Sequence, residues 1–182
     1  ELKSKPRIEF SNLTISGFEP GYTMIVKEKI GHITNFQIGE KVIDYLHLDW
    51  FETGKRILHK KTTSGQEVVM KFMRENQQLG QGDILFADES RLIVVAIRPC
   101  ECLIINPRSK FELASLCFEI GNKHLPLFYQ DDKLLVAYDA PLFRLLVSAG
   151  YDVIKEDARL ENPLKTSVSP HGDSGKDSLF SK

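Results

Sequence analysis

The chain has little of what several protein classes require. It holds 3 cysteines in 182 residues, too few for a disulfide framework, which favours a reducing cytosolic compartment. Its 24 basic and 25 acidic residues give a net charge of −1, without the cationic excess of proteins that coat nucleic acids or acidic membranes. The longest apolar run, Leu92–Ile97, falls far short of a membrane helix of roughly 20 residues. We therefore expect a soluble intracellular protein.

Signatures of common enzymes are also missing. The sequence contains no Walker phosphate loop, no Gly-x-Gly-x-x-Gly, no Gly-x-Ser-x-Gly, no His-Glu-x-x-His and no Cys-x-x-Cys. Its hydrophobic fraction of 42% suffices for a packed core. Potential metal ligands are few, because the chain has only 5 histidines and 3 cysteines.

Residues 24–98 have the pattern of a small all-β domain. Leu46, Leu48 and Trp50 alternate with polar neighbours, which is typical of a half-buried strand. Short strand-like segments, the first over 25–30, are separated by turn signals, so about six strands and no long helix are expected. Residues 1–23 are an extension to which the sequence assigns no function.

Residues 99–158, which begin at Pro99, predict a β-α-β-β-α-β order, the ferredoxin-like or split βαβ arrangement of an α+β fold. Ser109 and Glu112 form a capping-box pair at the first helix, and Gly121 is expected to end that helix as its left-handed cap. Asp139 caps the second helix, which Gly150 ends. The core-facing positions expected on the two helices are Leu113, Leu116, Cys117 and Ile120, then Leu142, Leu145, Leu146 and Ala149. Strands are expected over 102–105, 125–129, 134–138 and 151–154, and residues 159–182 read as a flexible tail.

The remaining candidates for chemistry each have an ordinary structural explanation. Cys100 and Cys102 lie on one side of a strand, where packing is the expected role of free cysteine. The histidines His47 and His59 occupy strand positions at the surface. Turn chemistry accounts for Asp131 and Asp132. His124 and His171 are each isolated in sequence, and a metal site needs three or four ligands.

Several segments nevertheless resemble one family, the urease accessory protein UreE family. The segment Glu119-Ile120-Gly121-Asn122-Lys123-His124 is similar to the family pattern Glu-Ile-Gly-Asn-Arg-His, with Lys123 replacing the usual arginine. The segments 46–56 and 82–86 also look like the family. The similarity spans roughly residues 24–171, although the tail holds only His171 where many relatives have a histidine-rich end.

The resemblance implies a nickel metallochaperone that is not an enzyme. It implies a peptide-binding-like β domain and a metal-binding domain through which two copies form a homodimer. His124 resembles the metal-binding histidine that both copies present, and His171 resembles the tail histidine that completes the site. The implied ion is Ni(II), with Zn(II) as an alternative, and the implied partners are the UreG GTPase and the urease apoprotein complex.

Two other functions compete with this one. A small metallohydrolase would use His124 with Asp131 and Asp132, and would bind one metal per monomer. A peptide-binding chaperone or a zinc buffer would bind its partners without regard to nickel. Nickel stoichiometry measured together with oligomer mass separates these alternatives.

Overall fold

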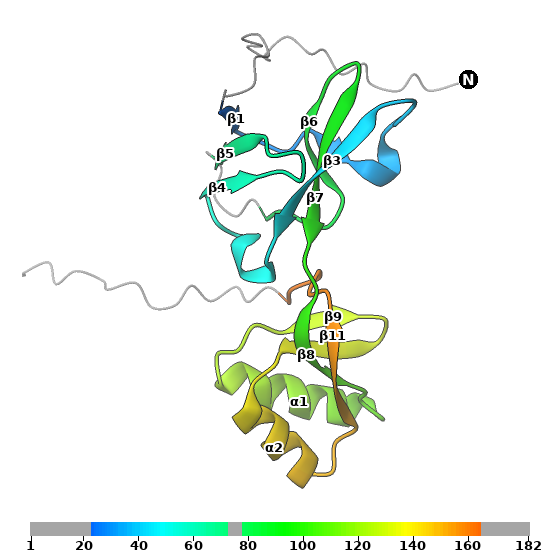
Figure 1. Ribbon diagram of the computed structural model, residues 1–182. Coiled ribbons are helices and arrows are strands. Elements are labelled where there is room, and N and C mark those ends of the chain that lie inside the picture. The colour runs from blue at the N-terminus through cyan, green and yellow to red at the C-terminus, as the bar shows by residue number, and fades with distance from the viewer. Residues whose placement is uncertain (1–22, 73–77, 165–182) are drawn as a thin grey trace, which may run out of the picture.

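The computed structural model describes residues 23–72 and 78–164, which form two domains joined by a short connection between β7 and β8 (Figure 1). The upper domain is made of strands and short 3-10 helices, and the lower domain combines a sheet with two α-helices. The expected order of a β domain followed by a ferredoxin-like domain is confirmed.

The N-terminal domain packs a three-stranded sheet, β1-β5-β4, against a four-stranded sheet, β2-β6-β7-β3. Its core forms between them because alternate side chains of Leu46 and Leu48 from one sheet meet Val68 and Met70 from the other. The elements are β1 (Met24–Val26), β2 (Gly31–His32), η1 (Ile33–Asn35), β3 (Val42–Leu48), η2 (Trp50–Glu52), β4 (Ile57–Lys61), β5 (Glu67–Lys71), β6 (Asp83–Ala87) and β7 (Arg91–Ile97).

Two expectations in this domain were wrong. The strand expected over 25–30 ends at Val26 as β1, and the next strand, β2, starts only at Gly31 and belongs to the other sheet. The alternation through Trp50 does not continue as strand, because β3 ends at Leu48 and the chain turns into η2. The backbone N–H of Asp49 donates to the Glu52 carboxylate at 3.0 Å, and this local bond stabilises the turn.

The C-terminal domain has the expected element order and a fully antiparallel sheet, β11-β8-β10-β9. Both helices pack on one face of it, where Leu116 and Ile120 of α1 and Leu142 and Leu146 of α2 are buried against the strands. The elements are β8 (Cys100–Ile105), α1 (Lys110–Asn122), β9 (Phe128–Gln130), β10 (Lys133–Ala137), α2 (Ala140–Ser148) and β11 (Val153–Ala158).

The second helix follows its prediction except on one side. Leu142 N–H donates to the Asp139 side chain at 2.7 Å, and Gly150 ends the helix with a φ of 78°. Leu145, however, is 39% exposed, and Ala149 is also exposed. The buried face is rotated from the predicted one toward Phe143, which packs against the core with Leu142 and Leu146.

Residues 159–164 belong to the folded domain and do not begin a tail. Leu160 is buried, Pro163 forms a bridge with Phe128, and Leu164 N–H donates to the Leu127 carbonyl at 2.8 Å. The last strand is also longer than expected, because β11 pairs with β8 along its whole length. His171 lies outside the described residues.

The open face of this sheet contacts the N-terminal domain. The ring of Trp50 meets Phe128 edge-on, with centroids 5.7 Å apart, and Cys102 and Leu160 pack in the same cluster. Arg159 Nε donates to the Ile97 carbonyl at 3.1 Å across the junction. The loop turned by η2 therefore helps to dock one domain on the other.

Candidate metal site

His124 follows the C-terminal end of α1, and its side chain is exposed. The helix ends through two bonds: Lys123 N–H donates to the Ile120 carbonyl at 3.1 Å, and His124 N–H donates to the Gly121 carbonyl at 2.9 Å. His124 itself has a φ of 56°. Among residues other than glycine, histidine is one of the types enriched in this left-handed region.

The prediction that Gly121 is the left-handed cap was wrong. Gly121 lies within α1, and the helix continues to Asn122. Glycine permits a helix to end but does not force it to. The stronger signal is Pro126, since the residue before a proline is disfavoured in helical conformation and the chain must leave the helix upstream of it. The reversal therefore falls on His124, whose side chain is exposed.

Hydrogen bonds at the start of α1 hold in place the helix that leads to His124. Glu112 N–H donates to Ser109 Oγ at 3.1 Å, which confirms the predicted cap. The second half of the capping box differs, because the Glu112 carboxylate accepts the backbone N–H of Arg108 and not that of Ser109. The guanidinium of Arg108 also pairs with Glu112 at 2.7 Å and donates to the Gly150 carbonyl at 3.0 Å, which ties the start of α1 to the end of α2.

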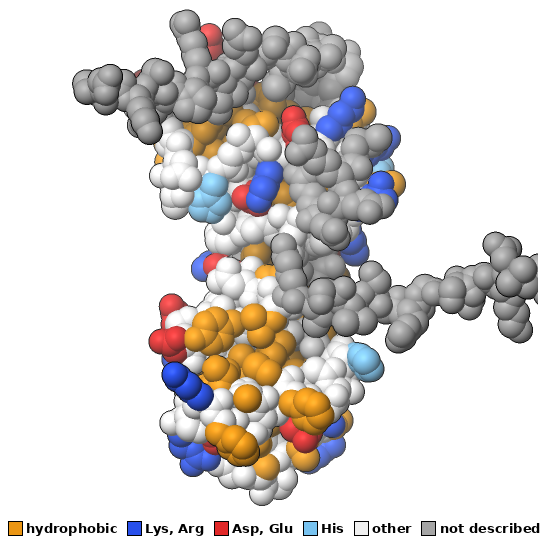
Figure 2. All heavy atoms as spheres, turned by 180° about the vertical axis from the view of Figure 1, so that it is seen from behind, with side chains coloured by type: hydrophobic (Ala, Val, Ile, Leu, Met, Phe, Trp, Pro, Cys, Tyr) orange, Lys and Arg blue, Asp and Glu red, His pale blue; other side chains and the backbone are white. Residues whose placement is uncertain are grey.

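The outward face of α1 is apolar. Phe111 is 83% exposed and Phe118 is 69% exposed, and their spacing of seven residues puts them on one side of the helix. The small residues Ala114 and Ser115 lie between them on the same side. We call these four residues and Gly121 the outer face of α1. Figure 2 shows hydrophobic side chains gathered on the lower domain, with a histidine at their margin.

The signal for this face was present in the sequence. Phe111 and Phe118 fall on the side of α1 opposite the core residues Leu116 and Ile120, a position that is usually polar in a surface helix. A periodicity that is read only for the core-facing positions does not detect this second apolar side.

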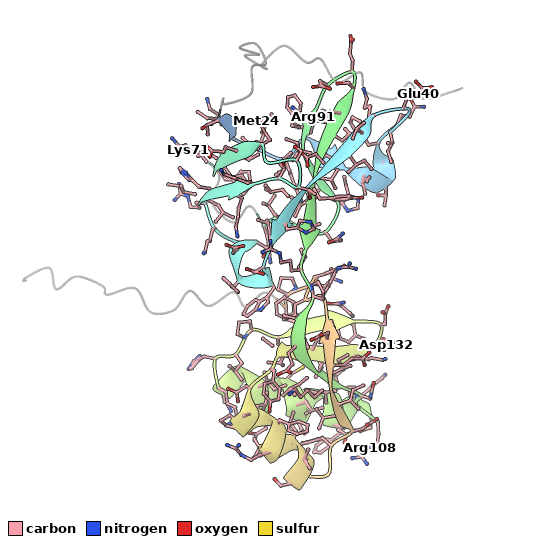
Figure 3. The ribbon with its side chains drawn as sticks, in the orientation of Figure 1. Met24, Glu40, Lys71, Arg91, Arg108 and Asp132 are labelled. Carbon is pink, nitrogen blue, oxygen red and sulfur yellow. The ribbon has the colours of Figure 1, made fainter. Side chains whose placement is uncertain are left out.

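The structure does not bring His124 together with Asp131 and Asp132. The two aspartates form the turn between β9 and β10, both with positive φ, and Asp132 lies at the tip of that hairpin (Figure 3). His124 precedes β9, at the opposite end of the segment 125–130. The ligand set of the metallohydrolase alternative is therefore not assembled.

The cysteines and the other histidines occupy structural positions. Burial raises the pKa of Cys100, and it raises the pKa of Cys102 to about 12, so the thiolate form that binds metals is disfavoured. Their sulfur atoms lie 3.6 Å apart in the junction cluster, which confirms the packing role. His47 is half-buried and His59 is exposed.

Cys117 and His32 are also held by contacts within their own domains. Cys117 packs against the core of its domain, and burial raises its pKa. The ring of His32 lies 2.9 Å from both Thr34 Oγ1 and the Gln81 carbonyl, and it caps η1. Within residues 23–72 and 78–164, no three His, Cys, Asp or Glu side chains are grouped so that they could hold a metal ion. His124 is exposed and belongs to no such group among the described residues.

Comparison with known proteins connects both domains to one family. The UreE urease accessory protein N-terminal domain matches residues 26–98, and the C-terminal domain of the same family matches residues 100–177. The urease accessory protein UreE of Flavobacterium johnsoniae is 44% identical over 159 residues, which cover 87% of this chain and 96% of that protein.

More distant relatives are also urease accessory proteins UreE. The UreE protein of Actinobacillus pleuropneumoniae is 39% identical over 74% of this chain and 70% of its own length. That of Helicobacter pylori (strain Shi470) is 32% identical over 82% of this chain and 91% of its own length. In the described residues, neither α-helix is long and apolar enough to cross a membrane. The two matched domains and these relatives show that the chain belongs to the urease accessory protein UreE family.

Proposed function

We propose that this protein is a nickel metallochaperone, which binds Ni(II) at the interface of a homodimer and delivers it for assembly of the urease active site. The observation that carries the proposal is the exposed His124, held beside the end of α1 by a left-handed backbone. Imidazole nitrogen suits Ni(II), and Zn(II) competes for the same donors. The protein acts in the cytoplasm as a carrier, not as an enzyme.

The outer face of α1 supports the homodimer. Exposed phenylalanines separated by small residues form a self-complementary surface, in which the rings of one copy fit between those of the other. A two-fold axis beside this face brings both copies of His124 together. With His171 from one or both tails, the site gains three or four nitrogen ligands. Such an open site can release its ion, unlike a closed site of four thiolates.

In this proposal the two domains have different roles. Residues 99–158 bind the metal and residues 24–98 form a peptide-binding-like domain, with 1–23 as an extension and His171 supplying a further ligand. The partners that receive the ion are the UreG GTPase and the urease apoprotein complex. The membership of the chain in the UreE family supports this assignment of partners.

Nickel titration with simultaneous measurement of mass tests the proposal. We expect one high-affinity Ni(II) per dimer, lost in His124→Ala and weakened in His171→Ala, because each substitution removes an imidazole donor. The matched control is His59→Ala, which removes an exposed histidine from the other domain. Unchanged stoichiometry and affinity in His124→Ala would refute the assignment.

A second substitution, measured in the same experiment, tests whether the outer face of α1 is the dimer interface. Phe118→Lys places a charge in the middle of the outer face of α1, so we expect it to yield monomers by light scattering and to lose the high-affinity site. Val42→Lys is the control, since Val42 is as exposed as Phe118 but lies on β3. Dimers that persist in Phe118→Lys would show that the interface lies on another surface.

A further inference from the structure

Among the residues that the structure describes, no strand pairs with one edge of β4. It is an outermost strand of the sheet β1-β5-β4 (Figure 1). Phe72 N–H donates to the Arg56 carbonyl at 2.9 Å, and Thr62 N–H donates to the Gln66 carbonyl at 2.9 Å. Backbone groups alternate in direction along an antiparallel strand. The backbone N–H and C=O groups of Ile57, His59 and Lys61 therefore point away from β5. Within residues 23–72 and 78–164, these outward groups make no backbone hydrogen bond.

The same edge is strongly cationic. Four of the seven residues from 55 to 61 are lysine or arginine and none is acidic, in a chain whose net charge is −1. Two of these cations are neutralised, since Lys60 pairs with Glu52 at 2.7 Å and Lys61 pairs with Glu67 at 3.1 Å. The remaining cations, Lys55 and Arg56, have no ion pair within the described part of the chain.

The neighbourhood adds one more cation and two apolar contacts. Lys71 of β5 lies opposite Ile57 in register and is exposed at the edge of the domain (Figure 3). Ile57 of β4 is 65% exposed, and Phe51 of η2, which precedes β4 in the chain, is 56% exposed. The edge therefore offers backbone donors and acceptors, positive charge and the apolar side chain of Ile57 over one short length of strand, with Phe51 exposed in the preceding element.

We propose that the β4 edge binds an extended acidic segment of a partner protein as an added strand. Strand addition gains affinity from backbone hydrogen bonds and specificity from alternate side chains. Positive charge selects acidic residues in the added strand. It also disfavours a second copy of this chain as the occupant, because two β4 edges would bring their lysines and arginines together. This site is separate from His124 and does not depend on the metal.

A labelled peptide of alternating glutamate and valine is the probe, read by fluorescence anisotropy with the full chain. Two comparison peptides define the recognition: one has lysine in place of glutamate, and one has N-methylated backbone amides. We expect binding of the acidic peptide, and affinity lower by about tenfold or more for each comparison peptide, since each loses charge attraction or several hydrogen bonds.

Two substitutions in the protein locate the binding. His59→Pro removes an outward N–H without removing a bond between β4 and β5, and we expect it to weaken binding by about tenfold or more. Arg56→Glu with Lys71→Glu should weaken it similarly. Lys133→Glu with Arg144→Glu is the matched control, because it changes net charge equally at exposed positions of the other domain.

Three results would overturn the proposal. The first is no binding of the acidic peptide. The second is binding that the N-methylated peptide and His59→Pro leave unchanged, which would indicate charge attraction alone, as for a nucleic acid or an acidic membrane. The third is a change in oligomer mass in His59→Pro, which would make the edge a contact between copies. Circular dichroism of every variant shows whether it is folded.

Discussion

His124 holds a backbone conformation that side chains adopt at a cost. Its φ of 56° lies in the left-handed region, where a residue other than glycine loses on the order of 1–2 kcal/mol. Such strain persists where the surroundings determine the conformation, and it is common at functional sites. Here the bond from His124 N–H to the Gly121 carbonyl and the following Pro126 leave the chain little choice.

Comparing glycine with alanine at position 124 measures this strain directly. Both variants lack the imidazole, so they differ only in backbone freedom and one methyl group. We expect His124→Gly to be more stable than His124→Ala by about 1 kcal/mol, because glycine adopts positive φ readily. Urea unfolding of the metal-free proteins is the measurement. An alanine variant equal to or more stable than the glycine variant would show that the backbone at 124 is not strained.

At the scale of elements, the buried carboxylate of Asp44 joins strand β3 to the hairpin of β4 and β5. Ser64 N–H donates to Asp44 Oδ1 at 3.0 Å, and the Ser64 hydroxyl donates to the other oxygen. Burial alone would raise the pKa of Asp44, but hydrogen bonds from Ser64 and Thr62 and the charge of Arg91 outweigh it, so the pKa lies below 3.8. The charged form is therefore stabilised by folding.

The pH dependence of stability follows from the sign of this shift. A carboxyl whose pKa is lower in the folded state adds stability above its unfolded pKa and loses it as the pH falls through the folded value. We expect Asp44→Asn to reduce the free energy of unfolding at neutral pH by about 1–3 kcal/mol, and the difference to shrink below about pH 4.

Urea titrations of the two proteins at neutral and acidic pH give this difference. Asp152→Asn is the control, since Asp152 is an exposed carboxylate of the C-terminal domain. We expect it to alter stability little at either pH. A deficit in Asp44→Asn that is the same at both pH values would mean that the charge on Asp44 is not what holds β3 to the hairpin.

The starts and ends of the helices show how much of the fold sequence alone could predict. The starts of both helices were predictable, because Ser109 and Asp139 act on N–H groups two or three residues away. The end of α1 was not, because the permissive Gly121 and the restrictive Pro126 compete and only the folded chain shows which governs. For the proposed site, the resemblance to the UreE pattern suggested His124, whereas its left-handed backbone and the exposed phenylalanines of α1 came from the structure.

At the scale of the whole molecule, Trp50 connects the two domains. The alternation through Leu46 and Leu48 predicted that it would continue the strand, but η2 carries it to the junction, where its ring meets Phe128 at 84°. This contact joins residues distant in sequence, so no local pattern could reveal it. Edge-on aromatic pairs contribute roughly 0.5–1.5 kcal/mol beyond the area they bury.

Because Trp50 is the single tryptophan of the chain, its fluorescence reports on the junction. Phe128→Leu removes the edge-on ring while keeping an apolar side chain, so the protein stays folded with a loss of about 1.5 kcal/mol or less. We expect the emission maximum to move to longer wavelength, since the indole gains contact with water. The comparison is Phe118→Leu, which trims a phenylalanine on the outer face of α1 and should leave the emission unchanged. If Phe128→Leu leaves the emission unshifted while circular dichroism shows a folded protein, the indole is shielded by other groups and this ring pair does not dock the domains.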